Sequence, residues 1–523
     1  MKPPYWLLLS LSVLFFIGTT AFWIFKNNLP PAWDQAHYLE ASEIMRQALI
    51  NEGIFSFLTK TTTILAVKAP LIAILPLPLY LAFGSLPHVA LVINLIFMAV
   101  FYIFFYKLTT LIFNGRIALL SIVVISTMPL FYGLVRYFLV EFGLATIVVA
   151  WLYFLLKSEF LTNKKYLLLL GLFFGLGMLM KFHFFIFIAG PALIVIYGSL
   201  AKLGLKIFNF KNIIIFALPA LVITLPWYLR NIMTLLWKAK RASDPQLLGN
   251  LYYGPPFSFN NLYLSALDFI NYVISGYWFL VLLILAAIYL YKSKRIHINY
   301  FFLSWFLIPF IILYFGPNKD YRLMLPLLPP IAIFIGRLTD TLLAKNTFVF
   351  LAIVFLPIII YLNTAIFDAK LIEKRATFGP LIITDKKIGG YVQASRFESW
   401  PITEMLAHIA KNNRADKYRT VVLASEDEIF NINSLKYYAV LERLPLIIKS
   451  ASYFPEGTDY QTIEEVINQG DYLIMKTGGM TGPDNLNKFN GLILQNLDYQ
   501  KWEELPHNIR LPDGGKINIW KKS

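Results

Sequence analysis

Residues 88–106 read HVALVINLIFMAVFYIFFY, a stretch without a single Asp, Glu, Lys or Arg. A helix needs about 20 consecutive apolar residues to cross the hydrocarbon core of a bilayer. Comparable runs recur through the first 365 residues, and they predict an α-helical polytopic membrane protein with about 11 transmembrane helices. The predicted spans are 5–25, 88–106, 117–134, 142–156, 166–181, 183–200, 212–229, 270–291, 299–315, 321–336 and 347–364.

The composition of the whole chain agrees with this interpretation. Hydrophobic residues make up 58% of the 523 residues and charged residues only 15%, and the mean hydropathy is +0.62. Soluble domains contain about 45–50% apolar and about 25% charged residues, so a water-soluble or disordered protein is excluded. The chain has no cysteine, which excludes a thiol nucleophile, a disulfide framework and a cysteine-ligated metal.

The net charge of +16 is distributed unevenly along the chain. Residues 366–523 contain 20 acidic and 20 basic residues, whereas the first 365 residues contain 10 acidic and 26 basic residues. The bases of the first part stand singly between apolar runs, which is typical of loops on the cytoplasmic side of a membrane. Nucleic-acid binding, the other common use of a basic surplus, is therefore not expected.

One short apolar run, 69–83, contains Pro70, Pro76 and Pro78. Each proline removes a backbone donor, so we expect a membrane-associated helix here rather than a span. This choice places the basic loops inside, with an inner N-terminus and an outer C-terminus. The basic residues concerned are Lys107, Arg116, Lys157, Lys164, Lys165, Lys202, Lys206, Lys211, Lys292, Lys294, Arg295, Arg337 and Lys345.

The chain changes character after about residue 365, where helical and strand-like patterns alternate in a less apolar sequence. We expect an extracytoplasmic soluble α/β domain there. The expected helices are 402–410, 434–441 and 463–467, and the expected strands are 420–424, 444–448 and 472–475. Gly478 and Gly479 are interpreted as a turn. The predicted domains are 1–365, which includes a first outer loop at 26–87, and 366–523.

The ten acidic residues of the membrane part form a short list of candidates, because charge is costly near apolar spans. In the predicted topology, all of them except Glu159 and Asp340 lie on the outer side. A transporter would hold ionisable groups near mid-membrane, so this distribution favours an enzyme at the outer surface. The ten are Asp34, Glu40, Glu43, Glu52, Glu141, Glu159, Asp244, Asp268, Asp320 and Asp340.

The first outer loop begins with PPAWDQAHYLE at residues 30–40. Asp34 stands where a helix starts and is predicted as its N-cap, a role compatible with catalysis. His37 and Tyr38 follow three and four residues later and share its helix face. At the far end of the loop, Lys68 is either an interface anchor or converges with Asp34 on one site.

The segment WDQAHY at 33–38, followed by KAPL at 68–71, resembles the first-loop signature of the C-type membrane glycosyltransferases. These polyprenyl-phosphate-sugar-dependent enzymes include the protein O-mannosyltransferases and the lipid A aminoarabinose transferase. In that family an acid followed by a tyrosine opens the loop, and a lysine or histidine before proline closes it. Further similar segments are Arg136-Tyr137 with Glu141, 170–181 ending in Lys181, PWYLRN at 226–231 and YRLMLP at 321–326.

The resemblance covers residues 1–340 and implies the C-type glycosyltransferase fold and a polyprenyl-phosphate-linked sugar donor. Three positions depart from the family pattern. Gln35 stands where a second acid is common, Glu141 stands for the more usual aspartate, and Ala69 stands for proline. These departures leave the subfamily and the need for a divalent metal ion open.

The reaction that the resemblance implies requires a base and several cations. Asp34 is expected to take the proton of an acceptor hydroxyl as general base. The leaving phosphate needs nearby positive charge, for which Lys68, Arg230 and Arg322 are the candidates. Further contacts with the substrates are expected from His37, Tyr38, Arg136, Glu141, Lys181 and Tyr321.

Other interpretations apply to several of these residues. Arg230 and Arg322 also suit interfacial anchors, and Lys181 suits a charged break between two spans. Glu141 is placed either to contact substrate or to pair with Arg136. The six histidines are scattered singly, so their spacing gives no support to a protein-built metal site.

The sequence thus predicts an inverting glycosyltransferase in the plasma (inner) membrane of a bacterium, with its active site and C-terminal domain outside. Its partners would be a polyprenyl-phosphate-linked sugar donor and a lipid, glycan or protein acceptor. A polysaccharide polymerase or ligase and a lipid-linked sugar transporter are the alternatives.

Overall fold

A computed structural model describes the chain from residue 5 to residue 523. Contacts divide it into two compact units: Met1–Phe25, Thr61–Pro76 and His88–Ser395 form the first, and Lys26–Lys60, Leu77–Pro87 and Arg396–Ser523 form the second. Lys294, Arg295 and Lys345, assigned above to inner loops, lie outside the described residues. The ranges left out within 5–523 are 242–243, 249–250, 293–298, 344–346, 368–375, 385–393, 412–417, 455–456, 480–481, 483 and 507–508.

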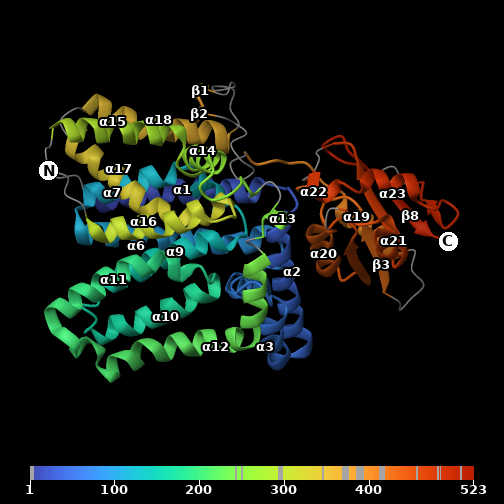
Figure 1. The fold of residues 1–523 in the computed structure, drawn as a ribbon, viewed down its shortest axis with the longest axis horizontal. Helices are drawn as coiled ribbons and strands as arrows, with labels where there is room; N and C mark the ends of the chain where they lie inside the picture. Colours follow the sequence, from blue (N-terminus) through green and yellow to red (C-terminus); the bar gives the residue numbers. More distant parts are fainter. Residues whose placement is uncertain are drawn as a thin grey trace. The chain divides into compact units, whose positions relative to one another are not determined.

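The first unit consists almost entirely of helices (Figure 1). In hydrocarbon every backbone polar group must be satisfied within its own segment, which makes a helix the stable form of these apolar runs. The α-helices are α1 (Tyr5–Lys26), α4 (Leu71–Ile74), α6 (Pro87–Ile112), α7 (Gly115–Ser126), α8 (Pro129–Leu134), α9 (Val140–Lys157), α10 (Lys164–Met180), α11 (Phe184–Leu203), α12 (Phe210–Arg241), α13 (Pro245–Leu248), α14 (Phe259–Asp268), α15 (Gly276–Lys292), α16 (Tyr300–Phe315), α17 (Leu328–Leu343) and α18 (Thr347–Tyr361).

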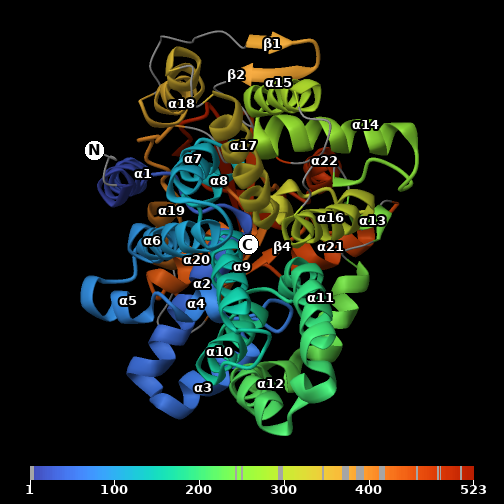
Figure 2. The same cartoon turned by 90° about the vertical axis from the view of Figure 1, so that its left-hand side faces the viewer.

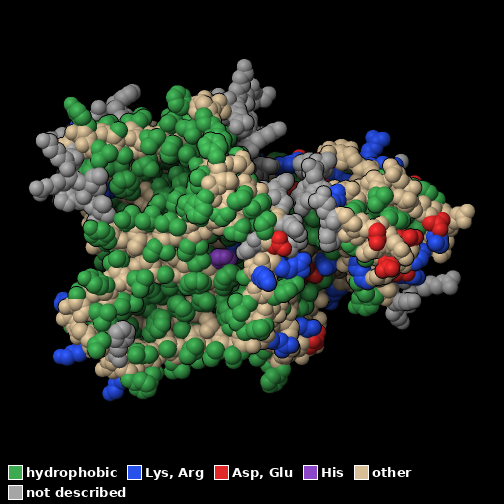
Figure 3. Space-filling view, in the orientation of Figure 1, with side chains coloured by type: hydrophobic (Ala, Val, Ile, Leu, Met, Phe, Trp, Pro, Cys, Tyr) green, Lys and Arg blue, Asp and Glu red, His purple; other side chains and the backbone are tan. Residues whose placement is uncertain are grey.

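Short irregular helices and one hairpin complete this unit. The 3₁₀ segments η2 (Gly204–Phe208) and η5 (Tyr321–Leu327) precede α12 and α17, and the π segments η4 (Phe269–Ile274) and η6 (Leu362–Ile366) follow α14 and α18. Strands β1 (Ala376–Phe378) and β2 (Leu381–Thr384) form an antiparallel hairpin. Apolar side chains cover much of the helical surface in Figure 3, as expected for a surface in contact with lipid.

Every predicted span contains a helix, which confirms a polytopic α-helical membrane protein. Among the described residues, six helices are long and apolar enough to cross a membrane, or seven if a pair bent by 98° counts as one span. The predicted span 117–134 is broken at Pro129 into α7 and α8, because proline cannot continue the helical hydrogen bonding. The number of 11 spans stays a prediction.

Two glycines on α10 allow α12 to approach it closely. A Cβ atom at Gly171 would lie 2.1 Å from the carbonyl oxygen of Phe216, and one at Gly175 would lie 2.8 Å from the Cβ atom of Ile223. Small residues at such positions let transmembrane helices pack backbone against backbone. The glycines of segment 170–181 thus hold α10 against α12.

The second unit contains a mixed sheet and the helices around it. The strand order is β4-β3-β5-β8-β6, with β7 beside β8. Strands β3, β4 and β5 are parallel, whereas β8 runs antiparallel to β5, β6 and β7. The strands are β3 (Arg419–Leu423), β4 (Leu446–Ser450), β5 (Tyr472–Thr477), β6 (Trp502–Glu504), β7 (Ile509–Arg510) and β8 (Lys516–Lys522). The α/β character expected from the sequence is confirmed.

Part of the first loop belongs to the same unit. Figure 2 shows α2 (Trp33–Gln47) beside α20 (Ile432–Leu441), and these two helices are in contact. The loop continues through η1 (Ala48–Glu52) into α3 (Ile54–Thr63). The remaining helices of this unit are α5 (Leu77–Phe83), α19 (Ile402–Lys411), α21 (Tyr460–Asn468), α22 (Asp484–Asn487) and α23 (Asn490–Asn496).

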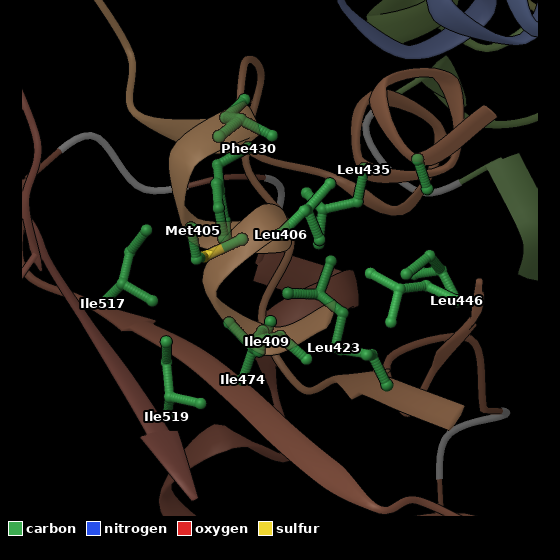
Figure 4. Close-up of a cluster of buried hydrophobic side chains, with 14 of the residues drawn as sticks. Met405, Leu406, Ile409, Leu423, Phe430, Leu435, Leu446, Ile474, Ile517 and Ile519 are labelled. Carbon is green, nitrogen blue, oxygen red and sulfur yellow. The ribbon is translucent and has the colours of Figure 1, made fainter. Parts of the chain in front are cut away.

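The core of this unit lies between α19, α20 and one face of the sheet (Figure 4). Leu29, from the loop that precedes α2, packs against the same core. The start of the first loop is therefore held by side chains of the C-terminal domain. The core residues labelled in the figure are Met405, Leu406, Ile409, Leu423, Phe430, Leu435, Leu446, Ile474, Ile517 and Ile519.

Candidate active site

A buried ion pair joins α9 to the end of α10 in the first unit. Glu141 lies in the first turn of α9, and Lys181 is the C-cap residue of α10. Lys181 Nζ donates to Glu141 Oε1 at 2.8 Å, and Glu141 is only 3% exposed. The other carboxylate oxygen of Glu141 has no hydrogen-bond partner among the described residues. The pairing with Arg136 that the sequence left open is therefore made with Lys181 instead.

A second ion pair lies at the beginning of α17. Arg322 Nε donates to Asp320 Oδ2 at 2.7 Å and to Oδ1 at 3.0 Å, and Asp320 is the N-cap residue of η5. Arg322 also interacts electrostatically with Glu141. Since α9 and η5 begin here and α10 ends here, two carboxylates and two cations gather at one end of these helices.

Arg136 is part of a different environment. Its side chain is 1% exposed and donates to the carbonyl oxygen of Ala365 at 3.0 Å and to Tyr361 Oη at 3.3 Å. The rings of Trp23, Tyr132 and Tyr361 lie 5.3, 5.3 and 5.6 Å from its guanidinium carbon. Cation–π contacts and carbonyl acceptors compensate the burial of the charge. Arg136 thus fixes α1 and η6 to the α8–α9 segment.

The segment that carries Lys68 is fixed to α12. Trp227 Nε1 donates to the carbonyl oxygen of Leu65 at 3.2 Å, and Asn231 Nδ2 donates to that of Thr62 at 2.8 Å. These hydrogen bonds join the far end of the first loop to the PWYLRN motif of α12. They place the segment before Lys68 next to the C-terminal half of α12.

Arg230 belongs to the same turn of α12. Its side chain is exposed, whereas Trp227 and Asn231 are buried. Tyr228 Oη donates to the carbonyl oxygen of Met178 at 2.9 Å and so ties this turn to the last turn of α10. The motif therefore holds α12 against α10 close to Lys181.

Tyr321 lies in an aromatic cluster beside these charges. Its ring stacks on that of Tyr272 at a centroid distance of 5.5 Å. Tyr253 Oη donates to Asp268 Oδ2 at 2.5 Å, which ties the proline-rich loop after α13 to the end of α14. Burial lowers the pKa of Lys319 to about 8, and Asp268 opposes this shift. The cluster adds an acid and a cation that the sequence analysis did not assign to the site.

Asp34 is placed differently from the prediction. The N-cap residue of α2 is Ala32, and Asp34 stands in the first turn of the helix, where a carboxylate is favourable. The N-cap assignment was therefore wrong. The reason is Trp33, whose φ of 43° starts the helix earlier through a left-handed backbone turn. Such a conformation costs about 1–3 kcal/mol in a non-glycine residue and is concentrated at functional sites.

His37 and Tyr38 follow Asp34 on α2 within the second unit. Tyr38 is 5% exposed, and His37 Nδ1 lies 3.8 Å from Glu40 Oε2. Burial raises the pKa of Tyr453, and the negative charge of Asp34 raises it further. Asp34 thus lies in reach of the loop that follows β4.

The segment before α2 is fixed by hydrogen bonds within the second unit. The N–H of Asn28 donates to the carbonyl oxygen of Arg396 at 2.8 Å, and the N–H of Arg396 donates to Asn27 Oδ1 at 3.1 Å. Ser434 Oγ, in α20, donates to the carbonyl oxygen of Pro31 at 2.8 Å. These bonds determine where α2 begins and therefore where Asp34 stands.

Two solved structures are similar to this chain in their fold. ArnT from Cupriavidus metallidurans, in a structure bound to undecaprenyl phosphate, is similar with a TM-score of 0.57 and 13% identity, over 98% of this chain and 97% of that chain. The Archaeoglobus fulgidus oligosaccharyltransferase, tethered to an acceptor peptide containing the NVT sequon, is similar with a TM-score of 0.51 and 12% identity, over 91% of this chain and 69% of that chain. A search of curated proteins gave no match.

Residues 67–229 also match the model of the dolichyl-phosphate-mannose-protein mannosyltransferase family. The chain therefore has the fold of ArnT and of the oligosaccharyltransferase. The matched range begins next to Lys68 and ends next to Arg230, and it includes Glu141 and Lys181. The resemblance inferred from the sequence and the predicted fold class are thereby confirmed.

The second unit contains a further charged cluster at the carboxyl ends of its parallel strands. Lys476 of β5 pairs with Asp427, which follows β3, and with Asp513 at 2.5 Å, all three being buried. Next to them, burial raises the pKa of Glu426 to about 7, although Ile432 N–H and Ser450 Oγ donate to its carboxylate. The sequence analysis missed this cluster because its members are distant in sequence.

Among the residues that the structure describes, no group of three or more His, Asp and Glu side chains is arranged to hold a metal ion. Two acids of the site, Glu141 and Asp320, are paired with cations instead. Glu141 and Lys181 are 40 residues apart in the sequence, whereas Asp320 and Arg322 are only two residues apart.

Proposed function

We propose that this glycosyltransferase moves a sugar from a polyprenyl-phosphate donor to a lipid, glycan or protein acceptor, with inversion at C1 of the sugar. The observation that carries the proposal is the gathering of Glu141, Lys181, Asp320 and Arg322 where apolar helices end. A lipid-linked phosphate needs cations at such a place and hydrocarbon beside it. The undecaprenyl phosphate bound in the ArnT structure supports this choice of donor.

The phosphate of the donor is proposed to bind Lys68, Arg230 and Arg322. Negative charge develops on the phosphate as it leaves, and preorganised cations in a low-dielectric site stabilise that charge. The guanidinium of Arg322 donates hydrogen bonds to both carboxylate oxygens of Asp320. The same planar group can donate to two oxygens of a phosphate. The oxygen Oε2 of Glu141 is available to a hydroxyl of the sugar.

Asp34 is proposed as the general base. The acceptor oxygen attacks C1 of the sugar while its proton passes to the Asp34 carboxylate, the bond from C1 to the phosphate oxygen breaks, and polyprenyl phosphate leaves. The position of Asp34 in the family motif and the strained backbone of Trp33 beside it support this role. His37 and Tyr38 are proposed to line the acceptor side.

The reaction is proposed to take place on the outer face of a bacterial plasma membrane. The distribution of basic residues supports this orientation. Lys181 ends α10 opposite to the basic turn at 157–165, and Arg230 lies in the half of α12 that is farther from the basic turn at 202–211. A donor made on a polyprenyl phosphate is itself a membrane lipid.

The test is transfer by the purified full-length protein from a panel of radiolabelled polyprenyl-phosphate sugars to membrane extracts. We expect Asp34→Asn to lower the transfer rate by about 10²–10⁴-fold, the usual contribution of a general base. Glu52→Gln is the matched control, because it replaces an exposed acid of the same loop and should leave the rate unchanged. Both variants should be inserted and thermally stable to the same degree as the wild type.

Lys68→Ala separates donor binding from base catalysis. We expect it to raise KM for the donor, whereas Asp34→Asn should lower kcat. A fully active Asp34→Asn enzyme would exclude the proposed base. Transport of a donor lipid by the protein without any product would exclude the proposed transfer.

A further inference from the structure

An apolar cavity of about 420 Å³ lies within the first unit between α15, α16, α17 and η4. Most of its lining is aromatic or aliphatic, and the polar exceptions are Asn299 and Arg337. Protein interiors leave few voids larger than a water molecule. A cavity of this size and lining among transmembrane helices is therefore a binding site for hydrocarbon.

The two polar lining residues lie at the same end of the helices. Asn299 is the N-cap residue of α16, and its Oδ1 accepts the N–H groups of Phe301 and Phe302 at 3.1 and 3.4 Å. Arg337 is near the end of α17, with its guanidinium carbon 5.3 Å from the ring centre of Phe113. This end of the cavity presents a cation beside an aromatic ring.

The cation is distant from the proposed donor site along α17. Arg322 lies near the start and Arg337 near the end of the apolar segment Tyr321–Leu343, whose 23 residues are long enough to cross a membrane. A lipid whose phosphate binds Arg337 would place its headgroup on the other side of the membrane core from Arg322. The sugar donor, proposed to bind Arg322, does not satisfy that geometry.

We propose that this cavity binds an anionic phospholipid of the opposite leaflet, with its phosphate on Arg337 and an acyl chain among the aromatic side chains. Charge complementarity selects an anionic headgroup, because basic pockets between transmembrane helices bind such lipids. Arg337 is the cation among the described residues that line the cavity. This lipid supports the helices and takes no part in transfer.

The experiment measures lipids retained by the purified full-length protein, by extraction and mass spectrometry, after exchange into micelles with equal phosphatidylglycerol and phosphatidylcholine. We expect phosphatidylglycerol to be retained preferentially, and Arg337→Gln to lower that retention about fivefold, the usual effect of one basic residue. Lys292→Gln is the matched control, because Lys292 is an exposed cation at the end of α15 that does not line the cavity. It should retain the wild-type amount.

A second variant tests the apolar part of the site. Leu303 lines the cavity and is 39% exposed, so Leu303→Trp should fill the space and lower retention without loss of the fold, as judged by thermal stability. Equal retention of the two phospholipids, or equal retention by wild type and Arg337→Gln, would overturn the proposal. So would retention of polyprenyl phosphate that depends on Arg337.

Discussion

The pKa of Glu426 shows how burial changes the ionisation of a single side chain. The carboxyl group lies behind β3, where it is removed from water and receives the N–H of Ile432 and the hydroxyl of Ser450. Burial raises its pKa to about 7 from 4.5, so the folded protein binds a proton more tightly there than the unfolded chain. Its contribution to stability is therefore present at low pH and is lost as pH rises from about 4.5 through about 7.

Replacing this acid by its amide gives the first prediction. At pH 8 Glu426→Gln should stabilise the protein by about 3 kcal/mol, because it removes a buried charge. The amide oxygen can accept the N–H of Ile432, and the amide NH2 can donate to Ser450 Oγ in place of the bond that Ser450 now donates. At pH 5 the difference should be small. Thermal unfolding at the two pH values measures it, with the exposed Glu503→Gln as control. The same shift in melting temperature at both pH values would contradict the pKa assignment.

For single residues, the sequence predicted which side chains belong to the candidate site better than it predicted their interaction partners. Glu141, Lys181 and Arg322 were selected as site candidates, and the structure brings them together. Arg136 was assigned to the substrate as well, but its guanidinium is enclosed by three aromatic rings. Tyr132 stands four residues before Arg136, but the rings of Trp23 and Tyr361 come from distant parts of the sequence, so no local pattern shows that Arg136 is enclosed.

Among the elements, α10 and α12 show how a motif can serve packing. Gly171 and Gly175 face α12 so closely that a Cβ atom would meet Phe216 or Ile223. The end of α10 carries Lys181, and α12 carries Arg230. The distance between the two helices therefore sets the distance between two of the cations proposed to act on the substrates.

Gly171→Ala should force these helices apart. We expect a loss of stability of about 1–3 kcal/mol, as for an overpacked core, and a lower transfer rate, because Lys181 moves with α10. Gly198→Ala is the matched control, since a Cβ atom there meets nothing within 4 Å. Thermal stability and transfer activity check both variants. An unperturbed Gly171→Ala protein would show that the close approach is unimportant.

The elements themselves were largely predictable. Long apolar runs predicted the helices of the first unit, and alternating patterns predicted β3, β4 and β5. Strands β6 and β7 were missed because they have only three and two residues. Strand β8 was also missed, although its alternation of polar residues with Ile517 and Ile519 is typical of a strand. The start of α2 was misplaced because the positive φ of Trp33 is not expected for a tryptophan.

At the scale of the whole molecule, the unexpected feature is which segments of the chain make up the second unit. The sequence divides most naturally after residue 365, where the charge balance changes. By contacts, however, residues Lys26–Lys60 belong with Arg396–Ser523. Ser434 and Pro31 form a hydrogen bond although they are 403 residues apart, and no local pattern indicates such a pair.

Removal of residues 396–523 should therefore affect the first loop. We expect the shortened chain to remain in the membrane but to lose transfer activity, because α2 loses its packing against α20 and Leu29 loses its core. Limited proteolysis should cleave within residues 26–60 of the shortened chain and leave that segment intact in the full-length protein. Ser434→Ala, which removes one hydrogen bond, should have a much smaller effect. Equal protection of the loop in both chains would contradict this role.

The packing of α2 on α20 also has a consequence for biosynthesis. The ribosome adds about 5–20 residues per second, so Ser434 is made about 20–80 s after Pro31. During this interval Asp34 has already left the ribosome, but the surface that determines its position does not exist. If Asp34 acts as the proposed base, transfer therefore begins only after the C-terminal domain has folded, when all the membrane helices have already been made.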